Sequence, residues 1–187
     1  MKQNLFIEEF TIKNAKVTLR TPSMDDLINL TLLINSLVSE KAQIAFTQKV
    51  TIESEREWLT HHIASLEQNK SISIIAEINN EVIASSEMQI QPDTEIGIIG
   101  IIVKKNFRNL GIGTRMLKVI IAQANQRGIK RLRLHVLATN NPAIHTYAAL
   151  GFTETQRITN QHFRDNQYID EIIMERTLWC ILHLLDI

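Results

Sequence analysis

A short segment in the middle of the chain has the residue types and spacing of a phosphate-binding loop. Arg108, Gly111 and Gly113 follow an apolar run at 94–103 and precede a stretch with helical periodicity. The first backbone N–H groups of a helix are unpaired and lie at the positive end of its dipole, and glycine lets a phosphate approach them without a Cβ in the way. A neighbouring arginine adds a charge-assisted contact. We therefore predict that the amides of 110–114 bind a phosphate or pyrophosphate group.

Two other glycine-rich phosphate loops do not fit this segment. The dinucleotide-binding fingerprint needs a third glycine and a later acid that holds a ribose, and the sequence has neither at the required spacing. The Walker loop needs Gly-Lys-Ser/Thr, which does not follow. A purely structural role for Gly111 and Gly113, close packing of the helix on the preceding strand, stays open as an alternative.

Charge is segregated along the chain although the formal net charge is zero. Residues 1–93 carry 8 bases and 13 acids, whereas residues 94–187 carry 12 bases and 7 acids. The 58 residues of 96–153 contain no acid, which suits a polyanionic ligand. The alternative is an ordinary solvated surface that the acidic half balances in space. The bases of this stretch are Lys104, Lys105, Arg108, Arg115, Lys118, Arg127, Lys130, Arg131 and Arg133.

The elements that must position these residues form an α+β pattern. Alternating or continuous apolar runs bounded by turn residues predict strands, and apolar residues at helical spacing predict helices. We expect a mixed, mostly antiparallel central sheet of about seven strands, flanked by about four helices. Glycines at 97 and 100 suggest a bulge in the central strand, or the close approach of something other than a side chain. The strands are predicted at 16–21, 71–78, 81–91, 94–103, 131–137, 153–159 and 168–177, and the helices at 23–37, 51–66, 111–127 and 142–150.

Length and composition indicate a single soluble domain over 1–187. The chain is 44% hydrophobic and 21% charged, which is enough for one sizeable core and too apolar for a disordered chain. Its one cysteine, Cys180, cannot form an internal disulfide. The N-terminal residues do not resemble a secretory signal, and no apolar run is long enough to span a membrane. We expect a cytoplasmic protein.

Two groups of residues resemble the GNAT superfamily of acetyl-CoA-dependent N-acetyltransferases. The first is Val103 followed by Arg108-x-x-Gly111-x-Gly113, which resembles the family's pyrophosphate loop. The resemblance covers about 10–177 and is closest to bacterial members that acetylate small amines or protein N-termini. Residues 178–187 then form an apolar C-terminal extension. The second group, at the family's spacing, is Asn140, Ala143, Tyr147, Gly151 and Phe152.

The resemblance implies a role for each of these segments. Acetyl-CoA would be the co-substrate, with its pantetheine arm paired to the backbone of 101–103 and Asn140 bonded near its reactive end. Tyr147 would give a proton to the departing thiolate. The structural alternatives are a half-buried aromatic for Tyr147 and a helix cap for Asn140. The implied cofactor-binding residues are Ile101, Ile102, Val103, Arg108, Asn109, Leu110, Gly111, Ile112, Gly113, Thr114 and Asn140.

The general base is not carried over from the family. Some members place a glutamate where this chain has Gly97. Glu95 lies two residues earlier, on the same strand face, and is the candidate base; an inert acid at the end of the strand is the alternative. No His, Cys and carboxylate residues have metal-ligand spacing, so we expect no metal. The histidines near these segments are His61 and His62, predicted on the surface, His135, predicted in a core strand, and His145, predicted to point away from Tyr147.

The predicted function is therefore transfer of an acetyl group from acetyl-CoA to a primary amine of a small molecule or protein, by direct attack in a ternary complex. A non-catalytic acyl-CoA-binding module of the same fold stays open because Gly97 replaces an acid. A nucleic-acid-binding protein fits less well, because the basic stretch has few aromatic residues. Leu178, Ile181, Leu182 and Leu185 share a helical face, which predicts packing of the tail on its own domain or across a homodimer interface.

Overall fold

The chain folds into one sheet with four α-helices in the part that its computed structural model describes, residues 5–44 and 47–178. Eight strands hydrogen-bond in the order β1-β2-β3-β4-β5-β6-β8-β7, and the described pairings are antiparallel except for β5 with β6. The strands are β1 (Phe6–Ile12), β2 (Ala15–Arg20), β3 (Ser71–Ile78), β4 (Glu81–Ile90), β5 (Ile96–Val103), β6 (Arg131–Leu137), β7 (Thr153–Arg164) and β8 (Gln167–Thr177). The helices are α1 (Leu27–Ser39), α2 (Ile52–Glu67), α3 (Ile112–Gln126) and α4 (Asn141–Ala149), with short 3-10 helices η1 (Met24–Asp26) and η2 (Lys105–Phe107).

This architecture confirms the predicted α+β class and the mostly antiparallel sheet. One described strand, β1, was not predicted. None of its residues is fully buried, and the adjacent acids Glu8 and Glu9 interrupt any apolar pattern. The strand forms because it pairs with β2 at the edge of the sheet, a tertiary contact that the local sequence does not encode.

The described residues divide into two compact units. Within the described residues, the first unit comprises 5–44, 47–87 and 101–120, and the second comprises 88–100 and 121–178. The strands β4 and β5 and the helix α3 each contribute residues to both units.

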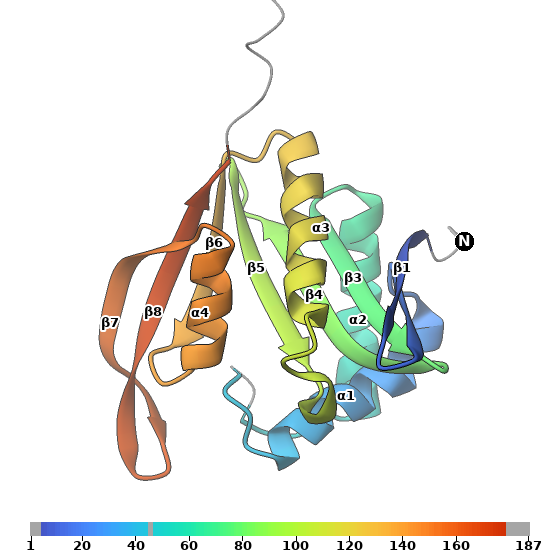
Figure 1. Cartoon of the computed structure of the whole chain (residues 1–187), viewed down its shortest axis with the longest axis horizontal. Helices are drawn as coiled ribbons and strands as arrows, with labels where there is room; N and C mark the ends of the chain where they lie inside the picture. The colour runs from blue at the N-terminus through green and yellow to red at the C-terminus, as the bar shows by residue number, and fades with distance from the viewer. Residues whose placement is uncertain (1–4, 45–46, 179–187) are drawn as a thin grey trace, which may run out of the picture. The chain divides into compact units, whose positions relative to one another are not determined.

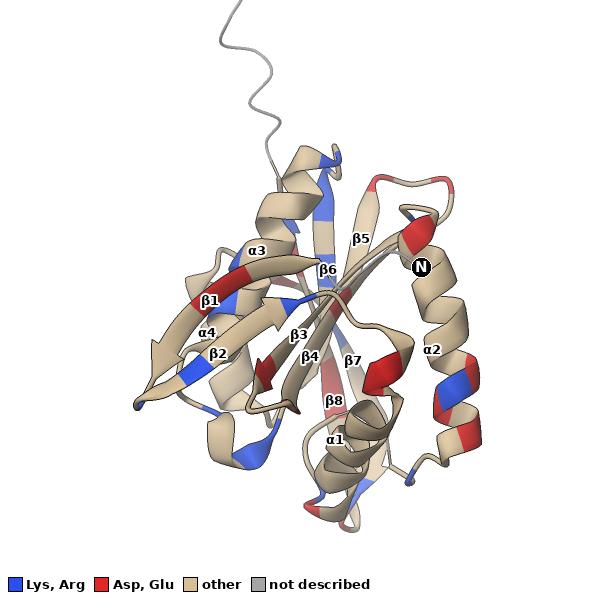
Figure 2. Ribbon diagram, turned by 90° about the vertical axis from the view of Figure 1, so that its right-hand side faces the viewer, with Lys and Arg blue, Asp and Glu red and all other residues tan. Residues whose placement is uncertain are grey.

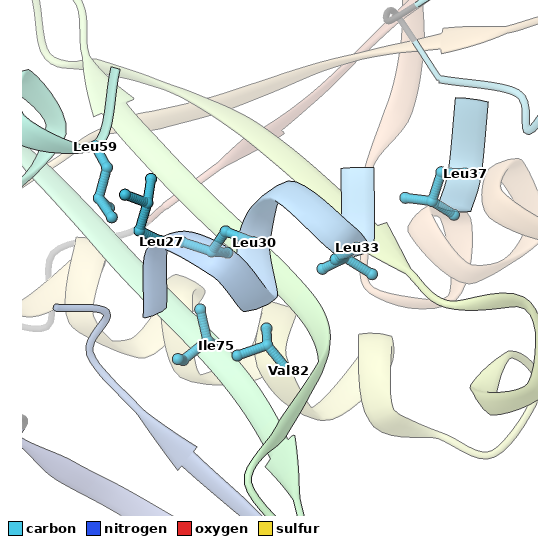
Figure 3. Packing of buried hydrophobic residues seen from close by; sticks show 7 residues of the cluster. All are labelled: Leu27, Leu30, Leu33, Leu37, Leu59, Ile75 and Val82. Carbon is cyan, nitrogen blue, oxygen red and sulfur yellow. The ribbon is translucent and has the colours of Figure 1, made fainter. Parts of the chain in front are cut away.

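The core of the first unit forms under α1. The apolar residues of α1 recur at helical spacing, so they share one face, and that face packs against β3 and β4 (Figure 3). The helical spacing of Leu27, Leu30, Ile34 and Leu37 in the sequence predicts one apolar face, and all four residues are buried. The seven buried residues of the cluster are Leu27, Leu30, Leu33, Leu37, Leu59, Ile75 and Val82.

A charged network fixes the start of the same helix. The guanidinium of Arg20 on β2 donates to both carboxylate oxygens of Asp26, at 2.8 and 2.6 Å, and also to Glu77 on β3. Asp26 also accepts from the backbone N–H of Ser23 at 2.8 Å, which caps η1. The hydrogen bond with Asp26, against the effect of burial, raises the pKa of Arg20 above its usual value. The network therefore ties η1 to two neighbouring strands.

In the second unit, β6 has two different faces. Leu132, Leu134 and Val136 are buried, whereas the alternate residues Arg131 and His135 are exposed. The helix α4 lies in front of β6 and β8 in Figure 1. Arg176 of β8 is the register partner of Leu132, so the two side chains lie on the same face of the sheet. Arg176 donates to the carbonyl of Leu150 at the end of α4, which shows that α4 covers this face.

The hairpin of β7 and β8 is longer than predicted. The sequence predicted strands at 153–159 and 168–177 with a loop at 160–167, but the strands continue to a two-residue turn. Asp165 and Asn166 form that turn with φ of 47° and 60°. Both residues tolerate positive φ, so they suit a tight hairpin turn. The prediction failed at 160–164 because two register shifts interrupt the alternation of side chains along β7.

The environment of Gly97 corrects an expectation from the sequence. A Cβ at this position would lie 2.4 Å from the sulfur of Met88 and 3.1 Å from Cδ2 of Leu132. The close approach at Gly97 is therefore made by a side chain, that of Met88. A glutamate at this position would displace Met88.

The end of the described chain docks on the second unit. Leu178 is buried, and its N–H donates to the carbonyl of Lys130 at 2.8 Å. The rest of the predicted apolar tail, with Cys180, Ile181, Leu182 and Leu185, lies outside the described residues. Among the described helices, none has both the length and the apolar character needed to cross a bilayer.

Candidate functional site

The predicted phosphate loop is the connection between β5 and α3, in the first unit. The N–H of Arg115 donates to the carbonyl of Gly111 at 3.0 Å, the first hydrogen bond of the helix. The amides of Ile112, Gly113 and Thr114 precede that bond, so they have no acceptor within the helix. These three groups lie where the helix dipole is positive, which is the arrangement that binds phosphate oxygens.

The two glycines of the loop have different roles. Gly111 has φ of +80°, and a Cβ built on it would meet nothing within 4 Å. A Cβ on Gly113 would lie 3.4 Å from Cδ1 of Ile101 and 3.6 Å from Cγ2 of Val103. The structural alternative, close packing of helix on strand, therefore explains Gly113. Gly111 instead leaves open space beside the first turn of α3, and a ligand could occupy that space.

Arg108 is already engaged within the protein. Its Nε donates to the carbonyl of Val103 at 2.9 Å, and its Nη2 donates to the carboxylate of Glu40 that follows α1. The guanidinium thus fixes the loop to the end of β5. Its side chain stays 37% exposed, so the predicted contact of Arg108 with a phosphate is still a prediction.

Asn140 and Tyr147 belong to the second unit. The Oδ1 of Asn140 accepts from the N–H of Ala143 at 3.4 Å, which confirms its role as the N-cap of α4. The ring of Tyr147 meets that of Phe152 edge-on, with 6.2 Å between centroids. Burial raises the pKa of Tyr147 to about 12, so the phenol keeps its proton at neutral pH. A protonated phenol can donate a proton and cannot serve as a base under these conditions.

Glu95, the candidate base, lies at an exposed position beside the start of β6. Its side chain is 59% exposed and forms an ion pair with Lys130 at 2.8 Å. Its carbonyl accepts from the N–H groups of Lys130 and Arg131, which places it beside the first residue of β6. The helix that carries Tyr147 begins after the other end of β6. Glu95 thus lies beside the start of β6, and the helix that carries Tyr147 follows the end of this strand.

A cluster that the sequence did not predict lies on the exposed face of β6. Nδ1 of His135 lies 3.0 Å from Oε2 of Glu171, and Nε2 of His162 lies 3.0 Å from Oε1 of the same carboxylate. Burial raises the pKa of Glu171, but the hydrogen bonds with the two imidazoles outweigh it and lower that pKa overall. His135 does lie in an inner strand of the sheet, as predicted, but on the exposed face of that strand. The alternation of RLRLHVL already separates His135 from the leucines and could have revealed its exposure.

A second titratable group lies in the first unit. His62 is buried, its ring stacks on Trp58 at 4.6 Å, and its Nδ1 lies 3.2 Å from Oε2 of Glu87 on β4. Burial lowers the pKa of His62 to about 4 and raises that of Glu87. The prediction that both histidines lie on the surface is therefore confirmed for His61, which is exposed, and wrong for His62. A neutral imidazole held between a ring and a strand packs α2 onto the sheet.

Most bases of the acid-free stretch are paired with carboxylates. Figure 2 shows the basic strand β6 and the acidic residues of β8 in the same unit. Glu175 of β8 forms ion pairs with Arg133 at 2.6 Å and with Arg131 at 3.7 Å. Since six of the nine bases are paired in this way, the stretch resembles a balanced surface more than a nucleic-acid-binding face. The six are Lys104, Arg108, Arg115, Lys130, Arg131 and Arg133.

The part of the chain that the structure describes contains no cluster of side chains suited to bind a metal ion. Within 5–44 and 47–178, no group of three or more His, Cys, Asp or Glu side chains is arranged to hold a metal ion.

Comparison with known proteins identifies the family. The model of the acetyltransferase (GNAT) family matches residues 36–152, which include the loop before α3 and the segment from Asn140 to Phe152. The chain belongs to the GNAT acetyltransferase family. Membership confirms the predicted class of acetyl-CoA-dependent N-acetyltransferase, and it favours the enzyme over the binding-module and nucleic-acid alternatives.

Individual relatives agree with this assignment. The [ribosomal protein bS18]-alanine N-acetyltransferase of Escherichia coli (strain K12) is 28% identical over 117 residues, 63% of this chain and 78% of that protein. Two solved structures share the fold. The ribosomal-protein-alanine N-acetyltransferase of Brucella melitensis is 21% identical, with TM-score 0.76 and coverage of 86% of this chain and 99% of that one. The ribosomal L7/L12 α-N-protein acetyltransferase in complex with coenzyme A is 17% identical, with TM-score 0.78 and coverage of 92% and 99%.

Proposed function

We propose that this GNAT enzyme acetylates the N-terminal amine of a protein or peptide. The observation that carries the use of acetyl-CoA in this proposal is the open space beside the backbone of Gly111. This residue lies at the start of a helix, within the segment that the family model matches. A diphosphate fits such a place because its oxygens can accept from consecutive amides. The acceptor is argued separately below.

The proposed cofactor site uses backbone more than side chains. The amides of 110–114 would bind the pyrophosphate of acetyl-CoA, with Arg108 holding the loop in place through Val103 and Glu40. The ladder of β5 with β6 covers Ile96–Ile99 of β5, so the backbone of Ile101, Ile102 and Val103 comes after its last pair. This supports the proposal that the backbone of these three residues pairs with the pantetheine arm, as a neighbouring strand would.

Tyr147 is the proposed proton donor. Bound acetyl-CoA supplies an acetyl thioester, whose sulfur leaves as a thiolate when an amine attacks. Tyr147 is protonated at neutral pH because burial raises its pKa to about 12. Its phenol is therefore available to give a proton to the sulfur. Asn140, which caps α4 two turns before Tyr147, would orient the reactive end of the cofactor.

The acceptor is proposed from relatives that act on ribosomal proteins. The relative from Escherichia coli is named for an alanine of a ribosomal protein, and it is similar over most of its own length. A small-molecule amine is the second candidate, because the chain's resemblance extends to family members that acetylate small amines. An assay can separate the two classes directly.

The test measures turnover of acetyl-CoA, and the readout is the release of the free thiol of coenzyme A. A hexapeptide that begins with alanine is compared with its N-acetylated copy and with a panel of polyamines and aminoglycosides. We expect turnover with the free peptide and none with the blocked copy. Turnover with a small amine alone would move the acceptor to the small-molecule class, and none with any amine would contradict the proposed function.

The remaining features of the proposed enzyme rest on the sequence. A single domain over 1–187 and a homodimer joined through the apolar tail are part of the proposal. So is a cytoplasmic location, because a chain with one cysteine has no need of an oxidising compartment. We propose neither a nucleic-acid partner nor a membrane partner.

A further inference from the structure

Two imidazoles share one carboxylate on the exposed face of β6. Oε2 of Glu171 faces Nδ1 of His135 and Oε1 faces Nε2 of His162, each at 3.0 Å. The side chain of His135 is 40% exposed, whereas those of His162 and Glu171 are 27% and 16% exposed. The carboxylate is thus the enclosed member, and His135 is the member most accessible from outside.

This arrangement selects the tautomer of His135. An ionised carboxylate only accepts hydrogen bonds, so the nitrogen that faces it must carry the proton. Nδ1 of neutral His135 is therefore the protonated nitrogen, and Nε2 keeps a free lone pair. The carboxylate also stabilises the imidazolium that forms when Nε2 accepts a proton. A carboxylate behind an imidazole gives a general base this orientation and this charge stabilisation in hydrolytic enzymes.

His135 also lies at a particular point of the sheet. The parallel ladder of β5 and β6 ends at the pair Ile99 and Leu134. His135 is the first residue of β6 beyond that pair, and the exposed Gly100 is the first of β5. The strand then continues through Leu137 into the turn that Asn140 closes, ahead of α4. His135 and α4 lie on opposite faces of β6, because α4 covers the face of Leu132.

We propose that His135 is the general base that takes the proton from the acceptor amine, with Glu171 and His162 as positioning residues. The inference rests on the proposed function. The amine nitrogen bonds to the acetyl carbon as the carbon–sulfur bond breaks. One amine proton goes to Nε2 of His135, and the sulfur receives a proton from Tyr147. Exchange with water then returns His135 and Tyr147 to their starting protonation states.

Opposite faces suit these two proton transfers. The attacking amine and the departing sulfur occupy different sides of the reacting carbon, so the group that accepts a proton and the group that donates one need different positions. His135 is on the open face of β6 and Tyr147 is on the helix that covers the other face. The alternative base Glu95 is paired with Lys130 at the start of β6.

The charges that face His135 are few. On β8 they are Glu171 and Glu175, and Glu175 is ion-paired with Arg133 of β6. On β7 the neighbouring titratable group is His162. Within the described ladder, β5 contributes no charged residue beside β6, since its paired residues are 96–99. Glu171 is therefore the charged group in direct contact with the His135 imidazole.

The first test is a kinetic comparison with the alanine-initiated hexapeptide. We expect His135→Gln to lower kcat by about 10²-fold, the usual contribution of a general base. Glu171→Gln should lower kcat by about tenfold and move the acidic limb of the kcat–pH profile to lower pH, because the imidazolium loses its counter-charge. The peptide's own amine titrates identically for every variant, so a limb that moves belongs to the enzyme. His61→Gln, an exposed histidine on α2, is the matched control and should change neither kcat nor the profile.

The second test does not need turnover. Long-range proton–nitrogen NMR of the full chain at neutral pH should show His135 protonated at Nδ1 and bare at Nε2. A proton on Nε2 overturns the inference. An unchanged kcat in His135→Gln also overturns it while leaving the acetyl transfer intact. Absence of turnover with every amine in the unmodified chain contradicts the proposed function instead, and with it the role of His135 as a base.

Discussion

At the scale of single residues, Tyr147 shows how burial prepares a side chain for one role. A phenol with a pKa of about 12 is protonated throughout the neutral range. Tyr147→Phe keeps the ring that packs edge-on against Phe152 and removes only the hydroxyl. We expect turnover to fall by about 10²-fold with little change in acetyl-CoA affinity, because proton donation matters only as the thiolate leaves. Unchanged turnover with a working acceptor would make Tyr147 a packing residue.

Gly111 tests the placement of the pyrophosphate. Gly111→Asn adds a side chain to the open space beside α3 while tolerating the positive φ of this position, so the fold should survive. We expect the affinity for acetyl-CoA, measured by isothermal titration, to fall tenfold or more, about 1.4 kcal/mol or above.

Arg115→Ala is the control for that measurement. Arg115 lies one turn further along α3, where it pairs with Glu8 and lies 4.4 Å from the centre of the Phe10 ring. Its loss should change the affinity far less. Equal, small effects from both variants would argue against a diphosphate at this helix terminus.

At the scale of elements, the buried His62 of α2 makes stability depend on pH. The pKa of His62 falls from 6.5 to about 4 in the folded protein. The unfolded chain therefore binds a proton between these pH values that the folded protein does not, and stability is lost as the pH falls from 6.5 towards 4. Glu87 acts in the opposite direction, because burial raises its pKa.

His62→Gln isolates the histidine contribution. Urea unfolding at a series of pH values measures the free energy of unfolding of each protein. From neutral to acidic pH, we expect this free energy to decrease in the variant by about 1–3 kcal/mol less than it decreases in the wild type. His61→Gln, one residue away and exposed, should follow the wild type. Parallel curves for all three proteins would show that His62 does not titrate differently on folding.

The charged network at the start of α1 offers a separate test of an element boundary. Asp26→Asn removes a buried charge that accepts two bonds from Arg20 and two from Ser23, one of these from the backbone N–H and one from the hydroxyl. We expect a loss of about 2–4 kcal/mol, since removing one partner of a buried pair leaves the other poorly compensated. The exposed Asp25→Asn should change stability by less than about 0.5 kcal/mol. Equal urea midpoints for the two variants would contradict this account.

Most elements were predictable because their patterns are local. The apolar stripe of α1 and the alternation along β6 follow from side-chain periodicity, and the structure confirms both elements. β1 and the far half of the β7–β8 hairpin were not predictable, because pairing and register shifts define them. The loop before α3 was predictable since its glycines and its place after a buried strand are local. The cluster at His135 was not, because it joins residues of three strands.

At the scale of the whole molecule, the tail decides whether the proposed enzyme assembles. Leu178 is buried against the second unit, and six of the nine residues that follow it are large and apolar. Such a segment needs a surface to cover it. Removal of 179–187 keeps the bond of Leu178 with Lys130, so the domain itself should stay folded. We expect light scattering to give a dimer for the full chain and a monomer for this truncation, whereas removal of 186–187 alone should leave the dimer intact. A monomeric full chain would refute the dimer, and loss of solubility on truncation would point to docking within one chain.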